Sequence, residues 1–186
     1  MKRSTLSRPL LLLTVGLFLL AVIAGGVLYL SPVGAPLITE NSGGFGPFDL
    51  RLSYTPDALI TVLSHYTGER TAEYERYYLL DFLFIGLYTL PQITGPLLFY
   101  RMSRKHYLLF RASVFSGIMH TFFDVIENIL LLNITHSTPF FTGTEGFMSS
   151  VCTSMKWAFA GIFVGSFMLF ILTTLFTLSR RKAKTR

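Results

Sequence analysis

Four polar residues that could do chemistry interrupt a long apolar segment of the chain. His120, Asp124, Glu127 and Asn128 lie within 107–132, a run otherwise apolar enough to cross a bilayer. A charged side chain at the centre of a spanning helix costs roughly 2.5 to 3.5 kcal/mol on insertion scales, so it faces a protein interior and often marks function. The segment is therefore predicted to carry the functional site.

These side chains share one face of the predicted helix. With His120 at zero and about 100° per residue, Asp124 falls near 40° and Glu127 near −20°. Ser113 and Ser116 fall on the same face, at about 20° and −40°. One narrow stripe thus carries nearly all the polarity of this segment, and we expect it to point into a helix bundle.

Two other apolar segments bring polar residues to the same depth. Asp81, Tyr88 and Gln92 share a face of the segment 78–100, and Lys156 enters the segment 152–178 near its start. We expect three helices to converge on one polar chamber in the outer half of the bundle. The predicted ligand-binding residues are Asp81, Tyr88, Gln92, His120, Asp124, Glu127, Asn128 and Lys156.

The chamber has a structural interpretation beside the functional one. Lys156 could pair with Glu127 or Asp124 in a network that orders the bundle without binding anything. Three carboxyl groups against one lysine nevertheless leave spare negative charge. That excess favours a bound cation, a protonated carboxyl group, or a nearby Arg51 or Arg76.

A metal site is the weaker interpretation of the same residues. His120, Asp124 and Glu127 have suitable types and spacing, but one helix supplies few ligands, and His65 and His136 are the remaining candidates. The chain has neither an HExxH motif nor a histidine pair suited to haem, and the lone Cys152 excludes a cysteine-rich metal site. We therefore predict no metal, and the sequence implies no particular cofactor.

Composition assigns the chain to the integral membrane proteins. Its 186 residues are 51% hydrophobic and 14% charged, with a mean hydropathy of +0.53. Four segments approach or exceed the roughly 20 residues that a spanning helix needs: 9–30, 78–100, 107–132 and 152–178. We expect an all-α, single-domain, four-helix transmembrane bundle, with the first helix uncleaved because apolar sequence continues to Leu30.

The basic residues predict the orientation. Twelve of the 16 Lys and Arg residues, and none of the ten acids, lie before the first segment, around the connection between the second and third, or after the fourth. By the positive-inside rule both termini are cytoplasmic, which suggests a plasma or bacterial inner membrane. The twelve are Lys2, Arg3, Arg8, Arg101, Arg104, Lys105, Arg111, Arg180, Arg181, Lys182, Lys184 and Arg186.

The external region, 31–77, is expected to have two parts. Its first part is rich in glycine and proline and predicts a loop. Its second part predicts a short amphipathic helix with Thr55 as the cap, Pro56 in the first turn and Gly68 as the stop, lying on the membrane or capping the bundle. Residues 69–76 should extend the second span, with Tyr74, Tyr77 and Tyr78 at the membrane interface.

Three classes of function fit these features. The first is binding of a lipid, a small amphiphile or a partner helix around the polar centre, since 18 Phe and 9 Tyr can supply apolar walls. The second is an enzyme acting on a lipid or isoprenoid, with Asp124 or Glu127 as acid or base and His120 as relay. The third is a proton-coupled transporter subunit. The expected partners are membrane lipids and a second copy or another membrane protein, and no nucleic-acid motif accompanies the net charge of +6.

The orientation can be tested with reporter fusions at Lys105, Gly143 and the C terminus. We expect the fusions at Lys105 and the C terminus to report the cytoplasm and the fusion at Gly143 to report the exterior, because the basic segments stay inside. A C terminus on the exterior would contradict both the number of spans and the shared depth of the polar residues.

Overall fold

The computed structural model describes residues 7–64, 69–138 and 140–183, and these are helical, with short connections and no strand. Four long helices form the bundle: α1 (Ser7–Leu30), α4 (Glu69–Ser103), α5 (Tyr107–Ser137) and α6 (Gly143–Ala183). In the described ranges four helices are long and apolar enough to cross a membrane. The predicted all-helical class with four such helices is thus confirmed.

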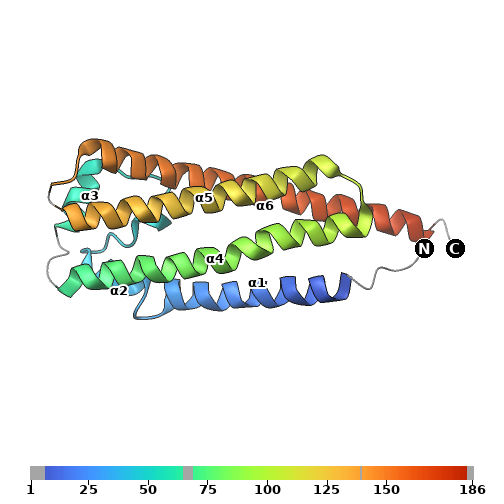
Figure 1. The fold of residues 1–186 in the computed structure, drawn as a ribbon, viewed down its shortest axis with the longest axis horizontal. Helices are drawn as coiled ribbons and strands as arrows, with labels where there is room; N and C mark the ends of the chain where they lie inside the picture. Colours follow the sequence, from blue (N-terminus) through green and yellow to red (C-terminus); the bar gives the residue numbers. More distant parts are fainter. Residues whose placement is uncertain (1–6, 65–68, 139, 184–186) are drawn as a thin grey trace.

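The helices are longer than the apolar segments that predicted them. α4 continues through Pro91 and Pro96, and α6 begins nine residues before the expected start at 152. A capping box explains that early start, because Thr142 and Glu145 exchange hydrogen bonds between their side chains and backbone amides. The start of α1, the connection between α4 and α5, and the end of α6 lie at the end of the bundle opposite α2 and α3 (Figure 1).

The prediction of a loop for the first part of the external region, residues 31–54, is partly wrong. This segment contains helix α2 (Ala35–Asn41) and the 3₁₀ turn η1 (Phe48–Leu50), which fold over the end of the bundle opposite the termini (Figure 1). Pro36 accounts for the start of α2, since proline suits the first turn of a helix. Turns at Gly43, Gly44 and Gly46, all with positive φ, then return the chain to η1.

The predicted amphipathic helix is present as α3 (Pro56–Leu63). The Thr55 side chain accepts a hydrogen bond from the Ala58 amide at 3.2 Å, and Leu59, Val62 and Leu63 are buried. The helix ends earlier than expected; the predicted stop at Gly68, together with Tyr66 and His65, lies outside the described residues.

The main hydrophobic core lies beneath the layer that α2, η1 and α3 form over the bundle. Tyr74, Tyr77 and Tyr78 are fully buried there, so the expectation that they lie at the membrane interface is wrong. They are covered because α2, η1 and α3 close over α4 and α5. The other large buried side chains of this core are Leu28, Ile38, Phe48, Leu59, Leu63, Leu131 and Ile134.

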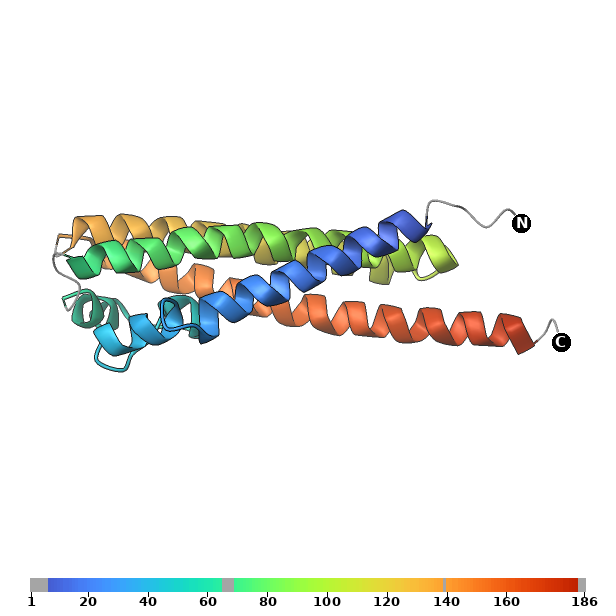
Figure 2. The ribbon, with the colours of Figure 1, turned by 90° about the horizontal axis from the view of Figure 1, so that it is seen from below.

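Helix packing leaves α1 at the periphery. α5 packs against both α4 and α6, whereas α1 packs chiefly against α4. Figure 2 shows α1 crossing α4 at an angle while α6 runs away from it toward the C-terminal end.

The turn after α1 has no room for a side chain at Gly34. A Cβ atom there would lie 2.0 Å from the Leu28 carbonyl oxygen, whereas a Cβ at Gly26 would meet nothing within 4 Å. Gly34→Ala should therefore lower the free energy of unfolding by about 1 to 3 kcal/mol, as overpacking does. Gly26→Ala should stabilise the helix by up to about 1 kcal/mol. Thermal unfolding in detergent measures both, and equal effects would contradict the close approach of Gly34 to Leu28.

Candidate functional site

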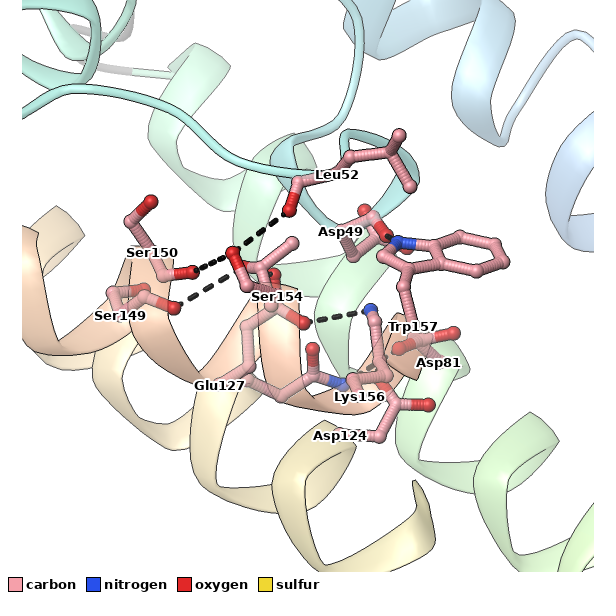
Figure 3. Close-up of polar contacts among 12 residues, drawn as sticks. Asp49, Leu52, Asp81, Asp124, Glu127, Ser149, Ser150, Ser154, Lys156 and Trp157 are labelled. Atoms are coloured by element: carbon pink, nitrogen blue, oxygen red, sulfur yellow. Dashed lines mark hydrogen bonds and ion pairs between the residues drawn. The ribbon is translucent and has the colours of Figure 1, made fainter. Parts of the chain in front are cut away.

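A buried lysine with two carboxylate partners lies at the centre of the polar residues. Lys156 Nζ from α6 lies 2.6 Å from Glu127 Oε2 and 2.9 Å from Asp124 Oδ1, both on α5. The exposed fractions are 4% for Lys156, 5% for Asp124 and 0% for Glu127. Figure 3 shows the three side chains converging. The structure thus brings together three of the predicted residues as one ion-paired group.

The second oxygen of each carboxylate accepts a hydrogen bond from a neutral donor. The Tyr88 hydroxyl on α4 donates to Asp124 Oδ2 at 2.5 Å, and Thr153 Oγ1 on α6 donates to Glu127 Oε1. Thr153 also lies 3.2 Å from the Tyr54 hydroxyl, which is 2.6 Å from Ser149 Oγ. A line of hydrogen-bonding groups therefore runs from α4, through the ion pairs, to the segment before α3.

Asp81 and Asn128 form a second buried pair between α4 and α5. Asn128 Nδ2 donates to Asp81 Oδ2 at 2.7 Å, and both side chains are at most 1% exposed. Asp81 Oδ1 and Asn128 Oδ1 have no hydrogen-bond partner among the described residues. This pair joins α4 to α5 but makes no ion pair with Lys156.

Asp49 is a member of the cluster that sequence reasoning missed. It lies in η1, is 2% exposed, and accepts hydrogen bonds from the Tyr77 hydroxyl at 3.1 and 3.3 Å. Its backbone carbonyl also accepts a hydrogen bond from Trp157 Nε1. Burial raises the pKa of the Asp49 carboxyl from 3.8 to about 6, although the nearby Lys156 charge opposes the rise. No periodic pattern marks this residue, because it lies in an irregular segment between two prolines.

Neither arginine considered for the spare negative charge joins the cluster. Arg51 donates to the Phe45 carbonyl at 2.6 Å and lies over the Phe45 ring, and Arg76 is exposed on α4. Among the described residues, Lys156 is the only buried Lys or Arg. With Asp49, four carboxyl groups are buried against this one lysine in the described chain, so the acidic excess is larger than expected.

His120 lies apart from the ion pairs. Its ring stacks on Tyr88, with centroids 4.9 Å apart, and its Nδ1 lies 3.0 Å from Gln92 Nε2. The Gln92 side chain lies against Gly117 of α5, where a Cβ atom would be 3.2 Å from Gln92 Oε1. His120 therefore supports the α4 residues Tyr88 and Gln92 rather than Asp124 or Glu127.

The three residues considered for a metal do not form a coordination site. Within the described ranges, no group of three His, Cys, Asp or Glu side chains is arranged to hold a metal ion. His120 faces α4, whereas Asp124 and Glu127 hold Lys156. The remaining histidine candidate in the described chain, His136, is exposed and lies 3.5 Å from Glu75.

An apolar groove adjoins this polar cluster. A cavity of about 450 Å³ lies between α1, α4 and α6, and Tyr88 and Gln92 are the polar side chains in its lining. The charged residues Asp124, Glu127 and Lys156 are not in that lining. The remaining lining residues are Phe18, Ala21, Val22, Gly25, Phe84, Pro91, Phe163, Val164, Phe167 and Met168.

Tyr88 and Gln92 therefore belong to both the wall of the groove and the polar cluster. Each contributes to the wall of the groove, and each directs its polar atoms toward α5, where Tyr88 bonds Asp124 and Gln92 lies beside His120. Comparison of the chain with protein-family models, with curated proteins and with solved structures finds no match. Function is therefore inferred from the groove and the cluster themselves.

The ion-paired group can be tested by a double-mutant cycle. Lys156→Met should lower the free energy of unfolding by about 3 to 5 kcal/mol, because it leaves buried carboxylates without their partner. Adding Glu127→Gln should recover part of this loss, since the second substitution removes a stranded charge. Chemical denaturation in detergent gives the coupling energy.

Asp57→Asn provides the control, because Asp57 is exposed on α3 and should combine additively with Lys156→Met. If Lys156→Met is also additive with both Glu127→Gln and Asp124→Asn, the three residues do not act as one group.

Proposed function

We propose that this protein is a multi-pass membrane protein, with both termini in the cytoplasm, that binds a small amphiphile or lipid in the groove between α1, α4 and α6. The observation that carries the proposal is the apolar cavity of about 450 Å³ whose wall includes Tyr88 and Gln92, the residues bonded to the polar cluster. Ligand sites combine apolar and aromatic walls with a few polar groups in this way.

The volume of the groove favours a small ligand over a partner helix. Pockets for small molecules and cofactors enclose roughly 300 to 1,000 Å³, and this cavity falls in that interval. Four phenylalanines, Phe18, Phe84, Phe163 and Phe167, contribute to its wall. Such a surface suits hydrocarbon, and in a bilayer a groove at the periphery of the bundle is open to lipid.

In this proposal the charged cluster supports the site instead of contacting the ligand. Asp124 and Glu127 are occupied by Lys156, Tyr88 and Thr153, so their oxygens are already committed. The hydrogen bond to Asp124 fixes the Tyr88 ring, which forms part of the groove wall. The cluster thus holds α4, α5 and α6 in the arrangement that forms the cavity.

Filling the mouth of the groove tests the proposal. Val164 and Ile162 lie two residues apart on α6 with exposed fractions of 54% and 52%, but only Val164 lines the cavity. Wild-type protein and Ile162→Trp, purified in a mild detergent, should retain a lipid or small amphiphile detectable by native mass spectrometry. Val164→Trp should lose most of it, because an indole occupies the volume that the ligand needs.

Equal retention by the two tryptophan variants would contradict binding in this groove. A bound polypeptide in place of a small molecule would show that the groove receives a partner helix. Melting temperatures of the two variants control for misfolding.

An enzyme acting on a lipid or isoprenoid is the second candidate, and one contact favours it. The Tyr88 hydroxyl lies 2.5 Å from Asp124, so a proton donor with a carboxylate partner lies at the wall of the groove. Comparing the masses of lipids before and after incubation separates the two functions. A binding protein leaves them unchanged, whereas an enzyme converts one of them, and Tyr88→Phe would abolish that conversion.

A further inference from the structure

A second cavity extends the groove toward the start of α1. Its volume is about 580 Å³, and it lies between the same three helices. Phe18, Pro91 and Phe167 line both cavities, so the two adjoin along the bundle. The two adjoining cavities, called the groove from here on, have outer ends that differ in chemistry.

Arg8 lines the end of the groove near the start of α1. It is the only charged residue in the lining of this second cavity, and it is exposed. The only other lining residue with a polar side chain, Thr14, donates its hydroxyl proton to the Leu10 carbonyl at 2.8 Å. No acidic side chain lines either cavity in the described chain. This end therefore offers one unopposed positive charge beside hydrocarbon.

The other end is suited to hydrocarbon alone. Tyr88 and Gln92 direct their polar atoms to Asp124 and His120, so they present mainly carbon to the cavity. Along α1, the distance from Arg8 to Gly25 is about 26 Å at ~1.5 Å per residue. One leaflet provides only about 15 Å of hydrocarbon, half of the usual ~30 Å. The groove can thus hold an extended chain that reaches past the midplane.

We infer that the groove takes an anionic single-chain amphiphile, with a carboxylate or phosphate headgroup at Arg8 and its hydrocarbon chain running toward Tyr88 and Gln92. The inference rests on the proposed function and adds the chemical class and orientation of the ligand. A guanidinium group hydrogen-bonds both carboxylate and phosphate oxygens. The predicted orientation of the chain places Arg8 at the cytoplasmic surface, where the headgroup of such a lipid lies.

Three probes with the same chain length test the assignment: hexadecyl phosphate, palmitate and hexadecanol. Their apparent affinities are measured by native mass spectrometry of the full-length protein in a neutral detergent. The wild type should bind both anions about tenfold more tightly than hexadecanol, the effect of a hydrogen bond to a charged group. Arg8→Gln should remove most of this preference and leave the affinity for hexadecanol unchanged.

Arg101→Gln is the matched control, because Arg101 is exposed at the same end of the bundle but does not line the groove. It should keep the preference for the anions. If Arg101→Gln loses the preference as Arg8→Gln does, general surface charge explains it and the inference is overturned. A preference for one anion over the other in the wild type would identify carboxylate or phosphate as the natural headgroup.

Failure of the inference can be told from failure of the proposed function. If hexadecanol and the anions bind equally to the wild type and Val164→Trp abolishes both, the groove is a ligand site but Arg8 does not select a headgroup. If none of the three probes binds, or if Val164→Trp leaves their binding unchanged, the groove is not the site and the proposed function also fails.

Discussion

The buried ammonium group of Lys156 determines how the half of this bundle opposite the termini is built. An unpaired charge in a low-dielectric interior is strongly unfavourable, so Lys156 needs carboxylate partners within ion-pair distance. Glu127 and Asp124 supply them from the neighbouring helix. Each carboxylate then needs a donor for its second oxygen, and Thr153 and Tyr88 provide these. One buried charge therefore links three helices.

Hydrogen bonds from this group also reach the layer that α2, η1 and α3 form over the bundle. Tyr54 extends the hydrogen-bonded line from Thr153 to the segment before α3, and Asp49 ties η1 to α4 and α6 through its hydrogen bonds with Tyr77 and Trp157. Burial of Tyr77 and Tyr78 beneath α2, η1 and α3, together with burial of Phe48 of η1 itself, contributes the apolar part of the stabilisation. A segment rich in glycine and proline is thus held in one arrangement by contacts to helices far away in the sequence.

The position of α1 gives the molecule its groove. Because α1 packs chiefly against α4, an apolar groove remains between α1, α4 and α6, and Tyr88 and Gln92 form the polar part of its wall. These two residues belong to both the wall and the polar cluster, so a change in the ion pairs would alter the shape of the groove through Tyr88. Stability of the cluster and the proposed binding are therefore physically coupled.

The four long apolar helices, the inward polar stripe of α5 and the amphipathic face of α3 can be predicted from the amino-acid sequence, because they follow from local composition and helical periodicity. The pairing of Lys156 with Asp124 and Glu127 can be predicted as well, since buried charges of opposite sign form ion pairs. Three features become visible only in the folded protein: His120 faces Gln92, Asp49 is buried against α4 and α6, and the cavity adjoins the charged residues instead of containing them. These features depend on contacts between residues far apart in the chain, and such contacts are fixed by how the helices pack rather than by any local pattern.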